Sequence, residues 1–259
     1  MKFALVNGQR HAAQPDLAGE CSWCGSPMVA RCGEVRTWHW AHKGRRLCDP
    51  WWENETLWHR AWKGQFPADW QEIVHHAEDG ERHIADVKTG DGWVIEFQHS
   101  YLKPAERRSR EAFYHSLIWV VDGMRRERDV VQFSRAWTSG TSRDPFSNKR
   151  RIPKPSGALL RDWAGSRVHV FFDFGDEREL WWLFPESDDE RAYVQRVSRA
   201  QCVRVLRDTG LREFDSLVDN FTAFIAPYES PPPTPRLRKL MVTPPRQNRL
   251  PMIRRRLRF

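Results

Sequence analysis

The chain has 259 residues, 40% hydrophobic and 29% charged, so it can bury a real core as one large domain or as two or three small ones. No apolar run approaches the roughly 20 residues that a membrane helix needs, and residues 1–10 lack a secretory leader pattern, which excludes a membrane protein and predicts a cytoplasmic location. Much of the net charge of +8 lies in residues 230–259, where prolines separate basic residues and no acidic residue occurs.

Residues 1–50 are rich in cysteine and in turn-forming residues. Four of the five cysteines lie there, and an odd total with most of its members in one short stretch favours a metal site over disulfides. A Cys-x-x-Cys-Gly sequence is typical of a zinc knuckle, and a His-x-x-His pair further on could complete a tetrahedral site. The predicted ligands of a structural Zn²⁺ ion are Cys21, Cys24, His39 and His42. Cys32 or Cys48 could replace one histidine, and the alternative is a set of reduced cysteines beside surface histidines.

The next predicted element is an amphipathic helix before the hairpin, whose apolar side carries Trp58, Ala61, Trp62 and Phe66. Its polar stripe carries Glu55, His59 and Lys63, which are spaced by four and therefore share one face. In the functional interpretation Glu55 holds or orients a metal ion, His59 relays a proton or binds phosphate, and Lys63 supplies positive charge. In the alternative the stripe is an exposed set of ion pairs, worth a few tenths of a kcal/mol.

A glycine-rich turn separates two predicted strands, residues 83–87 and 93–98. Side chains alternate along a strand, so Glu96 and Gln98 share one face, and Asp86 is expected opposite Glu96 at roughly 5 Å between Cβ atoms. Two carboxylates that close repel each other unless a cation such as Mg²⁺ or Mn²⁺ lies between them. Such an ion can polarise a phosphodiester and activate water, so the hairpin predicts nuclease chemistry. The alternative is an ordinary surface hairpin.

Pro104 is predicted to open a helix that leads to a buried strand over residues 117–121. This helix is expected to be the crossover to a strand parallel to the one that carries Glu96. Lys103 and Arg107 are the candidate DNA contacts of this segment, although most of its arginines are expected on a solvated face.

The remainder of the chain begins with a polar linker, residues 138–155, marked by glycine and proline. Two strands, 167–174 and 179–184, are predicted next. A helix is expected from residue 187 to residue 206, and a second one from 211 to 224.

The basic tail after residue 229 is predicted to be extended or disordered. Its arginines, among them Arg254, Arg255 and Arg256, are either DNA contacts that release counterions from phosphates or a solubilising end. Composition does not separate these two interpretations.

Several of these segments, in this order, resemble the competence protein CoiA-like family of the PD-(D/E)xK nuclease superfamily. The segments are Cys21-Ser-Trp-Cys24, His39-Trp-Ala-His42, Glu55 with His59 and Lys63, His83-Ile-Ala-Asp86, and Glu96-Phe-Gln-His99-Ser100. The resemblance covers roughly residues 20 to 122. It implies an α/β fold with a PD-(D/E)xK core, a central mixed sheet flanked by helices, behind a zinc-finger-like element. The expected organisation is a zinc-binding module at 1–50, the nuclease core at 51–137, a linker at 138–155, an α+β region at 156–229 and a basic tail at 230–259.

By this resemblance Asp86 and Glu96 hold a catalytic Mg²⁺ or Mn²⁺ ion, and Gln98 lies where the superfamily usually has lysine. Glutamine carries no charge, so either Lys63 or Lys103 supplies the charge from another element or the site is weakened. The expected function is metal-dependent hydrolysis of DNA, during natural transformation or related recombination, with recombination proteins as further partners. The alternative is a non-catalytic DNA-binding accessory protein, and an RNA-directed nuclease is a third reading, because phosphate contacts do not distinguish DNA from RNA.

Overall fold

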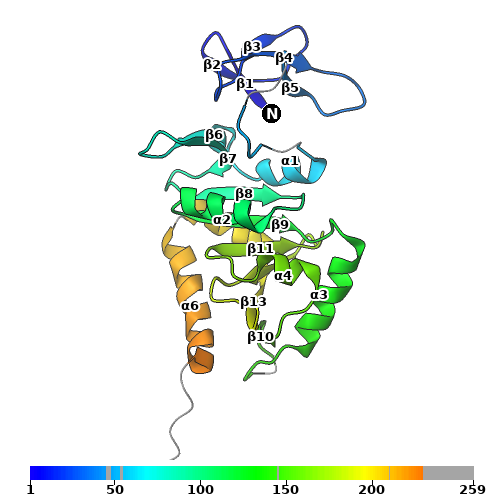
Figure 1. The fold of residues 1–259 in the computed structure, drawn as a ribbon, viewed down its shortest axis with the longest axis vertical. Helices are drawn as coiled ribbons and strands as arrows, with labels where there is room; N and C mark the ends of the chain where they lie inside the picture. The colour runs from blue at the N-terminus through cyan, green and yellow to red at the C-terminus, as the bar shows by residue number, and fades with distance from the viewer. Residues whose placement is uncertain (45–47, 53–54, 145, 210, 230–259) are drawn as a thin grey trace, which may run out of the picture.

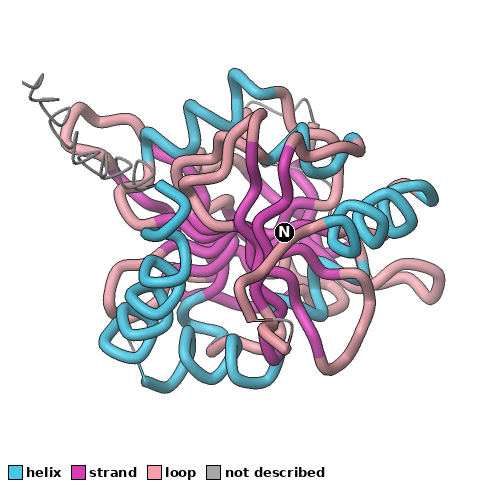
Figure 2. Tube along the Cα trace, turned by 90° about the horizontal axis from the view of Figure 1, so that it is seen from below, coloured by secondary structure: helices cyan, strands magenta, loops and turns pink. Residues whose placement is uncertain are grey.

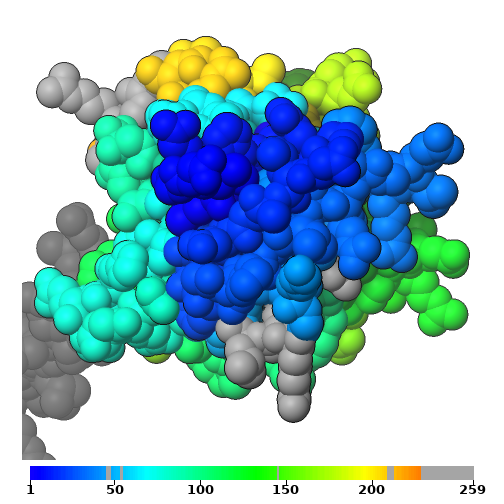
Figure 3. Space-filling model, turned by 90° about the horizontal axis from the view of Figure 1, so that it is seen from above, coloured from blue at the N-terminus to red at the C-terminus, as the bar shows by residue number. Residues whose placement is uncertain are grey.

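The computed structural model describes residues 1–44, 48–52, 55–144, 146–209 and 211–229, apart from the side chains of residues 209, 211, 212 and 229. Two sheets are stacked along the long axis of the molecule, with the N-terminal sheet at one end (Figure 1). Seen from above, the residues of that first sheet form a layer that covers this end of the protein (Figure 3). Among the described residues, no helix has the length and apolar character needed to cross a bilayer.

The first sheet is antiparallel, with the strand order β2-β1-β3-β4-β5. Its strands are β1 (Phe3–Val6), β2 (Gln9–Ala12), β3 (Ala18–Glu20), β4 (Pro27–Arg31) and β5 (His39–His42). Trp40 is buried against this sheet and donates its indole N–H to the carbonyl oxygen of His11 at 2.9 Å. Gly19 allows this close packing, because a Cβ atom there would come 2.8 Å from the carbonyl oxygen of Leu5 and 3.3 Å from Trp40. The N-terminal module therefore has a small core of its own, around one tryptophan.

The second sheet is mixed and has the strand order β10-β13-β12-β11-β9-β8-β7-β6. Its strands are β6 (Gln71–His76), β7 (Arg82–Lys88), β8 (Val94–Gln98), β9 (Leu117–Asp122), β10 (Lys149–Pro153), β11 (His169–Asp173), β12 (Glu179–Leu183) and β13 (Arg191–Ser198). The helices are α1 (Leu57–Lys63), α2 (Pro104–Phe113), α3 (Glu127–Ser139), α4 (Ala158–Trp163), α5 (Arg199–Arg204) and α6 (Leu211–Glu229), with short turns at η1 (Ala68–Trp70) and η2 (Val205–Thr209). The central strands β8, β9 and β11 run parallel, and their neighbours on both sides are antiparallel.

Helices cover both faces of this large sheet, which gives three layers (Figure 2). On one face α1, α5 and α6 pack against a core that includes Trp62, Phe97 and Phe221. On the other face α3 and α4 pack against a core that includes Trp119 and Phe133. All six residues of β9 are buried, as expected for a central parallel strand that is covered on both sides. The mixed α/β class predicted from the sequence is thus confirmed.

Two local predictions are confirmed as well. The hairpin forms as β7 and β8, with Ile95 and Phe97 facing the core under α1, and Val94 facing the opposite core. The helix opened by Pro104 is α2, and it leads into β9, which pairs in parallel with β8.

The predicted helix from residue 187 to residue 206 is wrong, because this segment contains β13 and only the short helix α5. Asp188 explains the error. Its Oδ1 atom accepts the backbone N–H groups of Glu190 and Arg191 at 2.9 and 2.8 Å, which is how an acidic residue closes a turn as well as how it begins a helix. The following residues then alternate between the two cores, with Tyr193 on one face and Val194 on the other.

The segment expected as a linker, residues 138–155, contributes the edge strand β10, which pairs with β13. The strands of residues 156–229 join the same sheet as the β7–β8 hairpin, because β11 pairs with β9. One sheet therefore runs from residue 71 to residue 198. The basic tail, with Arg254, Arg255 and Arg256, lies outside the described residues.

His169 on β11 makes stability depend on pH. Its ring packs among Trp182, Phe184 and Phe214, and its Nδ1 atom accepts the indole N–H of Trp182 at 3.2 Å. Burial lowers the pKa of His169 to about 4. Because the unfolded chain binds this proton near pH 6.5, stability is fully present above that pH and is lost as the pH falls toward 4. We expect the free energy of unfolding in urea to be about 2 kcal/mol lower at pH 5 than at pH 7.5 from this residue.

The control is His169→Gln, which keeps an acceptor for Trp182 but cannot take up a proton. This variant should lose about 2 kcal/mol less than the parent protein between the two pH values. An equal pH dependence in both proteins would refute the assignment.

Candidate functional site

Strands β7 and β8 separate at Asp86. Their backbone pairing covers Lys88 with Val94 and Val87 with Ile95. Beyond the Val87–Ile95 pair, carboxylate side chains accept backbone N–H groups of the neighbouring strand. The Oδ2 atom of Asp86 accepts the backbone N–H of Phe97 at 3.0 Å, and the Oε1 atom of Glu96 accepts that of Asp86 at 3.3 Å. The two carboxylates therefore lie together at the fork between the strands.

A cavity of about 40 Å³ opens at this fork. Each of the residues predicted for the catalytic site lies on its wall: Glu55, His59, Lys63, Asp86, Glu96 and Gln98. The cavity is also lined by Glu72 and Arg110, which sequence reasoning did not identify. The fold thus brings together residues from α1, from the segment before it, and from three strands and a crossover helix.

Helix α1 directs its polar stripe into the protein. The Thr56 side chain caps the helix by accepting the backbone N–H of His59 at 3.2 Å. The Nε2 atom of His59 lies 2.8 Å from Oδ2 of Asp86. Burial opposes ionisation of Asp86, but His59 and Lys63 outweigh it, so the pKa of Asp86 falls below its usual value. The alternative of an exposed ion-pair stripe is wrong, because only 6% of His59 and 3% of Lys63 is exposed.

Lys63 is the centre of a buried network of carboxylates. Its Nζ atom lies 2.9 Å from Oε1 of Glu72 and 3.8 Å from Oδ1 of Asp86, and it also forms an ion pair with Glu55. Burial would favour the neutral amine, but these three acidic groups raise the pKa of Lys63. Lys63 is therefore a cation beside Asp86, as expected if it replaces the charge that Gln98 lacks.

Glu72 connects this network to the N-terminal sheet. It has a left-handed backbone, with φ of +50°, inside strand β6. Its carboxylate accepts the backbone N–H groups of Lys2, at 2.8 and 3.0 Å, and of Phe3, at 3.1 Å. Burial alone would raise the pKa of Glu72, but Lys63, the amino terminus and the Lys2 N–H lower it to about 2. Neither a motif nor a periodicity marks Glu72 in the sequence, because its partners lie far from it along the chain.

Glu96 differs from Asp86 in its electrostatic surroundings. It is 6% exposed, and Arg110 offers only a distant countercharge, with 3.5 Å between its Nη1 atom and Oε2 of Glu96. Burial and the nearby Asp86 raise the pKa of Glu96 to about 8. The cavity therefore holds one strong and one weak acid, whose mutual repulsion a cation would relieve.

The network around Lys63 predicts a large effect on stability. We expect Lys63→Met to lower the free energy of unfolding by roughly 3–5 kcal/mol, because the buried Glu72 loses its lysine partner and Glu55 keeps only Arg60. Urea denaturation measures this loss. The double variant Lys63→Met/Glu72→Gln should recover part of it, since the second change removes an uncompensated charge. A loss below 1 kcal/mol for the single variant would contradict the network.

The other predicted site residues are Gln98, Lys103 and Arg107, and they lie in different surroundings. The Nε2 atom of Gln98 donates to the carbonyl oxygen and the hydroxyl of Ser100 at 3.1 and 3.2 Å. Lys103 is exposed at the start of α2. Arg107, expected to bind DNA, is buried instead, with its Nη1 atom 3.2 Å from the carbonyl oxygen of Trp163 and 3.6 Å from Glu111. Its guanidinium is therefore engaged in contacts within the protein and does not face solvent.

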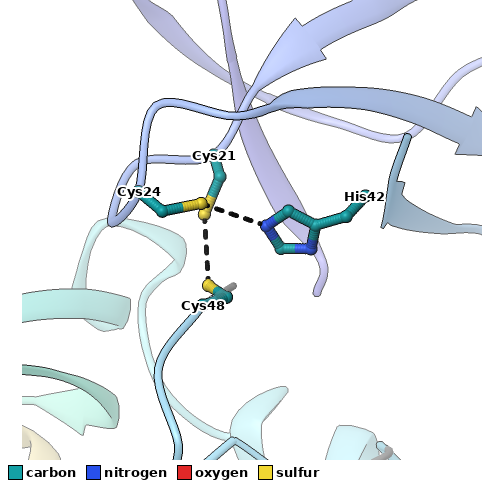
Figure 4. A group of neighbouring side chains, drawn as sticks. All are labelled: Cys21, Cys24, His42 and Cys48. Atoms are coloured by element: carbon teal, nitrogen blue, oxygen red, sulfur yellow. Dashed lines mark hydrogen bonds between the residues drawn. The ribbon is translucent and has the colours of Figure 1, made fainter. Parts of the chain in front are cut away.

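A second polar group lies in the N-terminal module. It consists of Cys21, Cys24, His42 and Cys48, whose ligand atoms all lie within 4.8 Å of one another (Figure 4). The Sγ atom of Cys24 is 3.3 Å from Nε2 of His42, and the Sγ atoms of Cys21 and Cys48 are 3.6 Å apart. Three sulfurs and one imidazole are a set that could hold a metal ion such as zinc.

Cys48 takes the place that the sequence prediction assigned to His39. The His-x-x-His pair lies on a strand, β5, where residues three apart point to opposite faces. Only one of the two histidines can therefore reach the cysteines. The Nδ1 atom of His39 is instead 2.9 Å from the carbonyl oxygen of Thr37. Cys32, the other alternative, is outside the group of four.

This cysteine cluster is fastened to the strand that carries Asp86. Trp23, inside the Cys-x-x-Cys turn, donates its indole N–H to the carbonyl oxygen of Arg82 at 2.9 Å. Asp49, next to Cys48, accepts the backbone N–H of Ile84 at 2.6 Å. The module and the large sheet thus meet within a few residues of the fork on β7.

Comparisons with known proteins do not add to this description. No family model, curated protein or solved structure matches the chain. The functional interpretation therefore depends on the geometry of the two sites and on the motifs that form them.

Proposed function

We propose that this protein is a metal-dependent nuclease that hydrolyses DNA phosphodiester bonds, related to the CoiA-like proteins and acting on incoming DNA during transformation or in a related recombination process. One observation carries the proposal: Asp86 and Glu96 meet at the β7–β8 fork and line one cavity together with Lys63. Two carboxylates at a strand fork with a lysine beside them support the proposed PD-(D/E)xK core.

The donor set suits a hard divalent ion. Asp86 and Glu96 are the proposed ligands of Mg²⁺ or Mn²⁺, since both are oxygen donors and the raised pKa of Glu96 reflects repulsion that such an ion would remove. A bound ion would polarise the scissile phosphate and offset charge on the leaving oxygen. Lys63 stabilises negative charge beside Asp86. His59 positions the Asp86 carboxylate through its 2.8 Å contact and can exchange a proton with it.

The cysteine cluster has a separate role in this proposal. Four protein ligands close a tetrahedral zinc site and leave no open position for substrate, so Zn²⁺ at Cys21, Cys24, His42 and Cys48 is structural. Through the contacts of Trp23 and Asp49 with β7, the zinc site would help to hold the fork in position.

A cleavage assay tests the proposal. Purified protein is incubated with labelled single-stranded DNA, duplex DNA and RNA of one sequence, with Mg²⁺, with Mn²⁺ or without added metal. Metal-dependent cleavage of DNA supports the proposal, and cleavage of RNA alone would change its substrate. Binding of DNA without cleavage under every condition would leave the accessory function as the correct one.

A further inference from the structure

Two surface depressions continue outward from the cavity at the fork. The first, about 460 Å³, shares Trp52 and Glu55 with that cavity. The second, about 1030 Å³, shares four residues with the first, namely Val35, Arg36, Thr37 and Arg60. The shared lining residues place the two depressions next to each other and the first one next to the cavity, and we call the two depressions together the Trp38 groove.

The walls of the Trp38 groove include a loop and a helix. One is the loop of residues 32–38 between β4 and β5, which extends from the N-terminal sheet on the side of α1 (Figure 1). The other is α1, whose Arg60 donates from Nη1 to the carbonyl oxygen of Trp38 at 2.8 Å. This bond holds the loop against the helix, so the groove has a defined second wall.

The groove displays a large aromatic ring and several cations. Trp38 is 47% exposed, although a side chain as large as tryptophan is usually covered in a folded protein. On the groove walls the cations Lys2, Arg36 and Arg60 outnumber the acidic residues Glu34 and Glu55. Arg60 is partly neutralised by Glu55 at 2.7 Å, whereas Arg36 is exposed in the loop.

We propose that the Trp38 groove binds single-stranded DNA and leads it to the cavity at Asp86 and Glu96. An exposed aromatic ring beside cations is the combination that recognises an unpaired strand, because the ring stacks on a base and the cations contact phosphates. A duplex keeps its bases stacked on one another and offers none to Trp38. The buried position of Glu96, with 6% exposure, points the same way, since a single strand can reach a recessed site more easily than a rigid duplex. This inference names the substrate of the proposed nuclease and therefore rests on that function.

A binding experiment tests the groove without cleavage. The test variant is Trp38→Ala/Arg36→Ala, and the matched control is Phe146→Ala/Arg178→Ala, which removes an exposed ring and an exposed guanidinium elsewhere. Fluorescence anisotropy of labelled oligo(dT) and of a duplex, without added Mg²⁺ or Mn²⁺, gives the dissociation constants. We expect the test variant to bind oligo(dT) about tenfold or more weakly, with no change in the control. The melting temperature should match the parent protein in both variants.

The outcomes separate this inference from the proposed function. If the test variant binds oligo(dT) as tightly as the control does, or if the parent protein prefers the duplex, the groove assignment is wrong even where DNA is cut. If the parent protein binds oligo(dT) through Trp38 but cuts no nucleic acid with either metal, the groove stands and the nuclease function falls.

Discussion

Asp86→Asn and Glu96→Gln should each lower the rate of metal-dependent DNA cleavage by about three orders of magnitude, since loss of the ion removes several kcal/mol of transition-state stabilisation. Both substitutions keep the shape of the side chain and replace a carboxyl group, which can bind the ion as a carboxylate, with a neutral amide. The measurement is the single-turnover rate with Mn²⁺, compared with Asp91→Asn, which changes an exposed acidic residue in the turn of the same hairpin.

The stability of these variants distinguishes a metal ligand from a structural residue. Because burial and Asp86 raise the pKa of Glu96 to about 8, a neutral amide at position 96 resembles the protonated acid that the folded protein already holds without metal. Glu96→Gln is therefore expected to leave the melting temperature in metal-free buffer unchanged or raised. A tenfold loss of cleavage or less in both variants would sink the catalytic assignment.

The cysteine cluster should contain one zinc ion per chain, and its loss should unfold the N-terminal module. Structural zinc sites bind with roughly 10–16 kcal/mol and the core of the N-terminal module is small, so Cys48→Ser and His42→Ala should lose both the metal and the thermal unfolding transition of this module. Elemental analysis and differential scanning calorimetry measure the two effects.

His39→Ala and Cys32→Ser are the matched controls for this experiment. Both residues lie close to the cluster in sequence but outside the group of four, so both variants should keep a full complement of zinc. If His39→Ala lost the metal and Cys48→Ser retained it, the ligand set described above would be wrong. Zinc loss should also weaken the binding of Mn²⁺ at the fork, because Trp23 and Asp49 would no longer hold β7 in place.

Much of the candidate catalytic site follows from local periodicity. His59 and Lys63 share one face of α1 because they are spaced by four, and Asp86 lies near Glu96 because two short strands flank a tight turn. Glu55 was expected on the same helix, but α1 begins at Leu57, and Glu55 reaches the cavity from the segment before it. Glu72 and Arg110 follow from no such rule. Each reaches the cavity from an element whose position depends on the packing of the whole sheet.

Local patterns were therefore sufficient for the hairpin, because the two-residue repeat of a strand fixes which side chains share a face. They were also sufficient for the α2 crossover, which Pro104 opens, and for the Cys-x-x-Cys turn. They were insufficient where two structures share one pattern. The Asp188 turn reads equally well as a helix start, and only pairing with β10 and β12 makes the following residues a strand. The choice of Cys48 over His39 likewise required the course of β5, since a strand can present only one of two histidines three residues apart to the same metal.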